Sequence, residues 1–179
     1  MNFKMKNQGF TLIEIIVVML IIGLLAALGI GSFTSSQIKS RDARRKSDLR
    51  QIANALEIYY NDYGNYPLGT NGMIMGCGSG GVQQCNWGET FSATPAGGGA
   101  EVVYMVQMPE DTQSHTYYYV SDRSSYEIYA RLENLLDRDI PKDNEEDPMV
   151  YQSTDCGIAT CNFGVASSNG SLAITIADN

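Results

Sequence analysis

The chain has 179 residues, a formal net charge of −8 at neutral pH and 44% apolar residues, which suits a single domain of ordinary size. The charge is unevenly distributed, because residues 10–62 carry a net charge of +1 whereas residues 63–179 carry −11. A C-terminal part this acidic would repel nucleic acid, so nucleic-acid binding is not expected.

The first element in chain order is an apolar run at residues 10–31, in which Glu14 is the only charged residue. As a helix this run would be roughly 33 Å long, about the thickness of a bilayer core. We therefore expect residues 10–31 to form a membrane-spanning helix. An ionised carboxylate within such a helix costs about 3 kcal/mol, so Glu14 needs a cationic partner.

The chain offers no Lys, Arg or His between residues 9 and 38 as that partner. If the chain were cleaved after Gly9, the new α-amino group of Phe10 would supply a cation. It would lie one turn from Glu14 in the same helix, and it could also meet Glu14 of a staggered neighbouring helix. Because each charge would then recover part of its desolvation cost only on assembly, this pattern predicts a polymer.

The leader and the start of the apolar run together resemble a known signal. A short basic leader, residues 1–9, ends at Gly9, and Phe10 opens the sequence Phe-Thr-Leu-Ile-Glu that runs into the apolar helix. This pattern resembles the prepilin signal of type IV pilins and type II secretion pseudopilins. The resemblance implies cleavage after Gly9, N-methylation of Phe10 and an assembly role for Glu14.

The same resemblance implies partners and a location. The partners would be further copies of the chain, minor pilins or pseudopilins, a prepilin peptidase and an inner-membrane assembly platform. The chain would cross the inner membrane once, with its N-terminus in the cytoplasm and its head outside, before entering a surface pilus or a periplasmic pseudopilus. Counting Lys and Arg alone favours the opposite orientation, because the leader has two and residues 39–50 have six.

Two simpler interpretations of the N-terminus compete with this one. An ordinary secretory signal has a shorter apolar core than residues 10–31 and lacks a carboxylate near its start. A plain single-pass anchor would fit the length of the run. Neither alternative gives Glu14 a partner.

A second helical pattern follows the apolar run. Residues 39–50 form a basic band, and apolar residues then recur at helical spacing: Leu49, Ile52, Ala53, Leu56, Tyr59, Tyr60 and Tyr63. Gly64 and Pro67 supply a stop signal. We expect an amphipathic stem helix within residues 32–66, similar from residue 48 onward to the stem of secretion-type major pseudopilins. The basic band could attract the acidic head of another subunit, or both could be solvated.

Four cysteines form two close pairs in the expected head, residues 67–179. An even count in an exported domain favours disulfides, and we expect Cys77 to pair with Cys85 and Cys156 with Cys161, because each pair brackets a short loop. A four-cysteine zinc site is the alternative, although neither pair has the usual ligand spacing.

The rest of the head is expected to be a loop followed by β structure. Residues 68–100 are rich in Gly and Ser and are expected to form a surface loop. Strands are expected at four segments rich in Tyr, Val, Ile and Thr, namely residues 102–108, 116–121, 126–133 and 172–177. A turn at residues 121–125 would join the second and third as a hairpin. A long N-terminal helix packed on an antiparallel sheet gives an α+β fold, which is also the pilin architecture.

Candidate chemistry in the head is sparse. His115 is the only histidine and no activated nucleophile accompanies it, so we do not expect an enzyme. Asp137, Asp139 and Asp143 could offer oxygen ligands to Ca²⁺, although their spacing does not match an EF-hand. Secretion-type major pseudopilins have a calcium site in their head loops, so the resemblance supports this hypothesis; a solvated loop is the alternative.

The sequence thus predicts a structural subunit, a pilin or pseudopilin that is cleaved, methylated and polymerised. The stem passage and the calcium hypothesis favour a secretion pseudopilus, whereas the long loop with a cysteine pair favours a surface pilus. The alternative function is a membrane-anchored periplasmic or surface binding module that does not polymerise.

Overall fold

The computed structural model describes residues 9–95, 97–111, 114–151 and 153–172, apart from the side chains of residues 27–32. The chain divides into two compact units, Met1–Ser40 and Arg41–Asn179. Most of the leader and nearly all of the strand expected at 172–177 lie outside the described residues.

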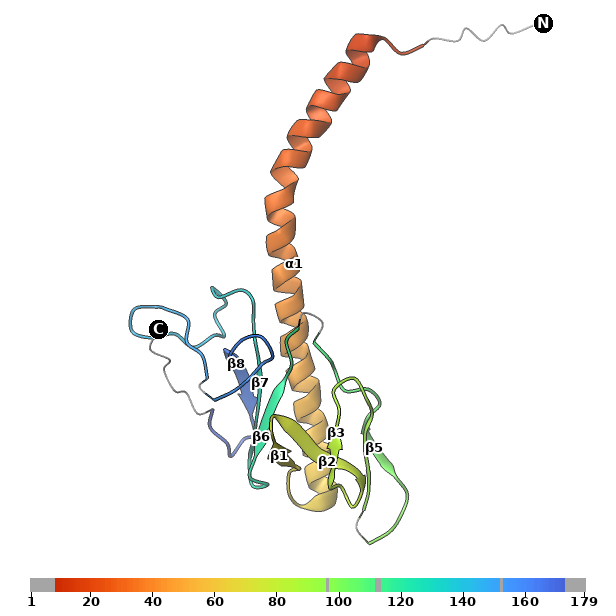
Figure 1. The fold of residues 1–179 in the computed structure, drawn as a ribbon, viewed down its shortest axis with the longest axis vertical. Coiled ribbons are helices and arrows are strands. Elements are labelled where there is room, and N and C mark those ends of the chain that lie inside the picture. Colours follow the sequence, from red (N-terminus) through yellow and green to blue (C-terminus); the bar gives the residue numbers. More distant parts are fainter. Residues whose placement is uncertain (1–8, 96, 112–113, 152, 173–179) are drawn as a thin grey trace, which may run out of the picture. The chain divides into compact units, whose positions relative to one another are not determined.

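A single helix, α1 (Leu12–Tyr63), covers both of the predicted helical segments (Figure 1). It ends where Gly64 adopts a φ of +70°, and the N–H of Gly64 donates to the carbonyl of Tyr60 at 2.8 Å. Glycine adopts this left-handed conformation without a Cβ clash, so Gly64 closes the helix as predicted.

The region expected to be a surface loop contains four strands, so that prediction is wrong. β1 (Leu68–Thr70) and β2 (Met73–Ser79) form a hairpin whose two turn residues, Asn71 and Gly72, both have positive φ. β3 (Gln83–Cys85) pairs antiparallel with β2, and β4 (Phe91–Thr94) pairs parallel with it. An Asn-Gly pair between short strands is a strong hairpin signal, and the sequence carried it.

Two glycines inside the strands of this region, Gly69 and Gly76, allow close packing, so a high glycine content did not indicate a loop here. A Cβ at Gly69 would lie 2.7 Å from the backbone nitrogen of Ser121, and one at Gly76 would lie 2.8 Å from the Cβ of Pro67. Glycine inside a strand commonly marks such a close approach of another chain segment. The region is therefore a packed part of the head.

The remaining strands complete two sheets. β5 (Val102–Met105) joins the first sheet, whose order is β1-β2-β4-β5 with β3 beside β2. β6 (Tyr118–Ser121), β7 (Tyr126–Ala130) and β8 (Phe163–Ala166) form an antiparallel second sheet. The strands predicted at 102–108, 116–121 and 126–133 are confirmed with shorter bounds, whereas β8 was not predicted because its four residues give almost no periodic signal.

The turn between β6 and β7 is the predicted hairpin turn. One carboxylate oxygen of Asp122 accepts the backbone N–H groups of Ser124 and Ser125, both at 2.9 Å. These bonds, led by the one from Ser125, lower the pKa of Asp122 to about 2. The side chain thus mimics a backbone turn and fixes the hairpin register.

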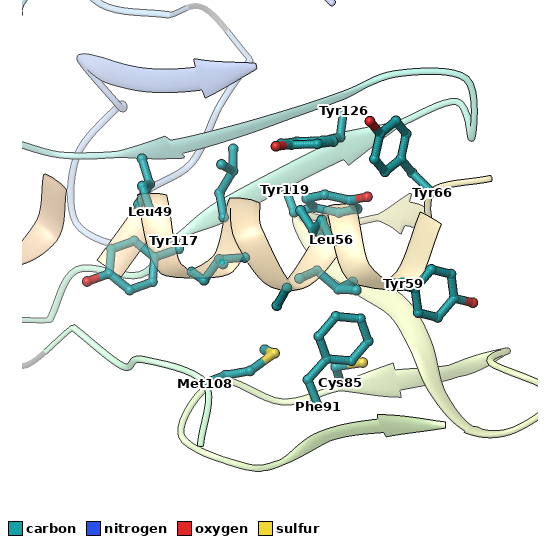
Figure 2. Packing of buried hydrophobic residues seen from close by; sticks show 14 of the residues in the cluster. Leu49, Leu56, Tyr59, Tyr66, Cys85, Phe91, Met108, Tyr117, Tyr119 and Tyr126 are labelled. Atoms are coloured by element: carbon teal, nitrogen blue, oxygen red, sulfur yellow. The ribbon is translucent and has the colours of Figure 1, made fainter. Parts of the chain in front are cut away.

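The core lies between the head part of α1 and both sheets. Figure 2 shows Leu56 and Tyr59 of the helix with Tyr119 and Tyr126 of the second sheet on one side. Phe91, Cys85 and Met108 lie on the other side. The predicted apolar stripe is confirmed at its centre, since four of its members are buried: Leu49, Ile52, Leu56 and Tyr59.

Both faces of β7 are buried. Tyr126, Ile128 and Ala130 are buried on one face, and Tyr129 is buried on the opposite face. Tyr129 belongs to a second, smaller cluster with Tyr151 and the disulfide Cys156–Cys161. The loop that carries these residues covers the side of the strand that alternation alone assigned to solvent.

Replacing Leu56 with alanine tests the core. Leu56 is fully buried, so Leu56→Ala should lower the free energy of unfolding by about 2–5 kcal/mol through lost burial and a residual cavity. The measurement is chemical unfolding of the full chain in detergent, followed by near-ultraviolet circular dichroism of the tyrosines. The control is Ile58→Ala, because Ile58 lies on the same helix and is 51% exposed; equal losses in both variants would contradict the assigned core.

Candidate assembly site

Thr11 and Glu14 form the N-terminal cap of α1. The N–H of Thr11 donates to Oε2 of Glu14, and the N–H of Glu14 donates to Oγ1 of Thr11, both at 3.4 Å. This reciprocal pair is a capping box, which satisfies two otherwise unpaired N–H groups at a helix start. A carboxylate in the first turn also faces the positive end of the helix dipole. Sequence reasoning missed this role, although the Thr-x-x-Glu spacing signals it.

The first turns of the helix expose apolar side chains on every side. Phe10 is 79% exposed, and the residues that follow it are exposed as well: Leu12, Ile13, Ile15, Ile16, Val17, Val18, Met19, Leu20, Ile21, Ile22, Leu24 and Leu25. A helix that is apolar all round is typical of one surrounded by lipid or by other protein. This surface needs a covering that the chain's own N-terminal unit does not provide in its described residues.

Across the described residues, no helical stretch satisfies the length and hydropathy of a bilayer span.

The predicted cleavage site is only partly described. Gly9 is exposed and precedes the helix, whereas residues 1–8 lie outside the described residues. Cleavage after Gly9 and methylation of Phe10 therefore stay predictions.

In the head unit, the basic band of α1 is anchored by a buried arginine. The guanidinium of Arg45 donates to both carboxylate oxygens of Asp111, at 2.6 and 3.1 Å, to Oδ1 of Asp42 at 3.0 Å and to Oε1 of Glu133 at 2.7 Å. Burial by itself lowers the pKa of Arg45, but the bonds to Asp111 and Glu133 outweigh it, so the pKa is raised. Arg45 is thus a permanent cation held by three carboxylates.

Glu133 links this arginine to a second one. Nε of Arg41 donates to Oε1 of Glu133 at 2.8 Å, and this pairing, together with Arg45, lowers the pKa of Glu133 to about 2 despite partial burial. The carboxylate of Asp42 accepts the backbone N–H groups of Glu133 and Asn134, at 2.9 and 2.8 Å. Helix and loop are therefore joined by both side-chain and backbone groups.

Lys46 extends the ionic network to the acidic loop. Its ammonium donates to Oδ1 of Asp137 at 2.6 Å and to Oδ2 of Asp139 at 2.7 Å, and it lies 5.6 Å from the centre of the Phe163 ring. Burial would lower the pKa of Lys46, but the two carboxylates raise it overall. Among the described residues, three basic side chains of the band therefore form ion pairs with head carboxylates of the same chain: Arg41, Arg45 and Lys46.

The structure brings together two of the three predicted calcium ligands. Asp137 and Asp139 share the ammonium of Lys46, whereas Oδ1 of Asp143 accepts the N–H groups of Glu145 and Asp147 in its own loop. Within the part of the chain that is described, no group of three or more His, Cys, Asp or Glu residues is placed to hold a metal ion. The calcium hypothesis gains no support from this arrangement.

Tyrosine hydroxyl groups of the head bond to carboxylates of α1, and sequence reasoning did not foresee this. The bonded pairs are Tyr117 with Asp48 at 2.7 Å, Tyr66 with Glu57 at 3.1 Å, Tyr126 with Glu57 at 3.4 Å and Tyr104 with Asp62 at 3.0 Å. Burial, followed by the bond to Glu57, raises the pKa of Tyr66 to about 12. These tyrosines stay protonated and can keep donating at any physiological pH.

The cysteines form the predicted pairs. Cys77 is bonded to Cys85 and Cys156 to Cys161, so none of the four offers a free thiolate for zinc. His115 is half-buried, and its Nδ1 lies 3.4 Å from the carbonyl oxygen of Cys156. His115 also forms an isolated β-bridge with Gly157, so its contacts here are structural.

The chain is similar to proteins of one group. The family model described as the prokaryotic N-terminal methylation motif matches residues 4–30. Type II secretion system core protein G of Pseudomonas aeruginosa is 28% identical over 131 residues, which are 71% of this chain and 84% of that protein. The type IV major pilin protein PilA of Myxococcus xanthus is 36% identical over 65 residues, 36% of this chain and 30% of that protein.

A third relative, type II secretion system core protein G of Escherichia coli, is 38% identical over 68 residues, 38% of this chain and 47% of that protein. The chain therefore spans most of one of these relatives and less than half of the other two. No solved structure matches the chain. The methylation motif, the helix-on-sheet fold and these relatives agree: the chain is similar to pilins and pseudopilins.

The acid stability of the head should depend on Glu133. Its pKa in the folded chain is about 2, below the ordinary 4.5, so the ionised carboxylate stabilises the fold fully above about pH 5 and loses this contribution as the pH falls towards 2. Glu133→Gln should be less stable at pH 7 and should show a flatter pH dependence across that window. Denaturation midpoints at several pH values, with Glu145→Gln as the exposed control, measure this; parallel profiles for Glu133→Gln and the unmodified chain would refute it.

Calcium should not stabilise the head. The two carboxylates that could begin a calcium site already bind the ammonium of Lys46, and Ca²⁺ would have to displace it. The melting temperature of the full chain should therefore be the same in millimolar calcium and in EDTA. Any specific binding would raise it by mass action, so a reproducible rise with calcium concentration would contradict this prediction.

Proposed function

We propose that the chain is a filament subunit that is cleaved after Gly9, N-methylated at Phe10 and polymerised through residues 10–31. The observation that carries the proposal is the first part of α1, which is apolar on all sides and has a single carboxylate in its opening turn. In a polymer, the same segment of other copies covers this surface. The relatives named as a secretion core protein and as a major pilin support this function.

Glu14 would direct the assembly step through its charge. The capping box satisfies the N–H of Thr11 and the N–H of Glu14, but it supplies no positive charge. After cleavage, the amine of Phe10 in a neighbouring copy would supply that charge, and the pair would form in an apolar filament core where an unpaired carboxylate is costly. Growth of the filament would therefore neutralise each Glu14 in turn.

The partners and route follow from the same proposal. A prepilin peptidase would remove the leader, an inner-membrane platform would extract the subunit, and minor pilins or pseudopilins would share the filament. The match across 84% of a secretion core protein favours a periplasmic pseudopilus over a surface pilus.

Two substitutions separate the charge of Glu14 from its capping role. Glu14→Gln keeps a side chain that can complete a capping box but removes the charge, and it should abolish filaments while cleavage continues. Thr11→Ala removes the capping hydroxyl but keeps the carboxylate, and it should leave filaments intact. Intact mass and the amount of subunit in the sheared and membrane fractions measure both steps; a normal filament yield from Glu14→Gln would overturn the proposal.

A further inference from the structure

In the proposed filament, identical acidic heads must pack near one another, and this inference rests on that function. Residues 63–179 carry a net charge of −11, so most orientations of two heads bring like charges together. Three cations of the basic band are already bonded inside the head. The cations that still face outward therefore decide where a second copy can approach.

Three of these outward cations lie on α1, namely Lys39, Arg44 and Arg50, and the last two belong to the head unit. Arg44 is 63% exposed and makes a long contact of 3.7 Å with Asp48, which also accepts a shorter bond from Tyr117. Arg50 is exposed six residues further along the helix. The exposed residues around them are short or neutral, and together they form the outer face of α1: Ala43, Arg44, Ser47, Arg50, Gln51 and Asn54.

The densest run of exposed carboxylates lies in the loop at residues 142–148, which contains Glu145, Glu146 and Asp147. This loop has a defined shape. Residues 142 and 148 form a β-bridge, and Oδ1 of Asp143 accepts the N–H groups of Glu145 and Asp147 at 2.9 and 2.8 Å. The shaped backbone lowers the ordering cost of binding. Within the loop, Nζ of Lys142 lies 3.7 Å from Oε2 of Glu146, whose side chain is 87% exposed.

We propose that the outer face of α1 binds the acidic loop, residues 142–148, of a second copy of this chain. The two guanidinium groups and the three carboxylates are complementary in charge, and the small exposed side chain of Ser47 between Arg44 and Arg50 lets the loop approach the helix. The contact joins one subunit's helix to its neighbour's loop, so it is heterologous and can repeat along a filament.

A charge exchange tests this pairing. Arg50→Glu and Glu146→Arg should each lower the amount of sheared filament at least three-fold, because each places like charges across the contact. The double variant, Arg50→Glu with Glu146→Arg, should restore most of the loss by reversing the pair. Filaments are produced from the full chain in cells that carry the peptidase and the assembly platform, and intact mass confirms processing in every variant.

The control is Arg138→Glu, which reverses an outward charge, 94% exposed, outside both proposed contact segments, residues 43–54 and 142–148. It should leave the filament yield unchanged, and all variants should keep the melting temperature of the unmodified chain, since exposed charges contribute little to folding. If the single variants keep the normal filament yield, or if the double variant does not regain it, the proposed contact is wrong. The proposal that the chain forms a filament would not be affected. An unmodified chain that is processed but forms no filament would instead overturn the proposed function, and this inference with it.

Discussion

The architecture of the head depends on the burial of one charged side chain, the guanidinium of Arg45. Moving such a group out of water is costly unless its donors are bonded to carboxylates in good geometry. Asp111, Asp42 and Glu133 provide this, and they come from the helix itself and from two segments far along the chain. Because each missing carboxylate would leave charge uncompensated, the network favours only one way of seating the helix on the sheets.

The polar groups along α1 extend this constraint in both directions. Arg41 and Lys46 bond to Glu133 and to the loop after it, and further along Asp48, Glu57 and Asp62 accept bonds from tyrosines of the head. The buried stripe of the helix supplies apolar area, as Figure 2 shows, but apolar contact alone permits sliding and rotation. The hydrogen-bonded groups at its margins define the register of helix against head.

The structural features that could be predicted from the sequence are those set by residues close together in the chain. The helix, its stop at Gly64 and the hairpin turn at Asp122 each depend on residues within a few positions of one another. The ionic network joins residues far apart, 66 positions between Arg45 and Asp111 and 93 between Lys46 and Asp139, and no periodic pattern reports such pairs. Only the fold determined that three cations of the basic band would meet head carboxylates of their own chain.

The strands β1 to β4 were missed for a related reason. Their glycines fit positions where another segment passes too close for a Cβ, and that need is created by tertiary packing. The Asn71-Gly72 turn was a local signal and could have been used. The capping box at Thr11 and Glu14 was also a local signal, because the Thr-x-x-Glu spacing alone predicts the two hydrogen bonds between these residues.

Glu14 and Arg45 are both charged groups that need a partner of opposite charge in an apolar environment, and they obtain it in different ways. Arg45 is buried within one chain, and its three carboxylates are present as soon as the head folds. Glu14 has its hydrogen bonds but no cation among the described residues of the N-terminal unit, and it stands in the opening turn of an apolar helix. In the proposed filament its charge would be balanced only by another copy, so the N-terminal segment is completed by assembly, whereas the ion pairs of Arg45 lie within one chain.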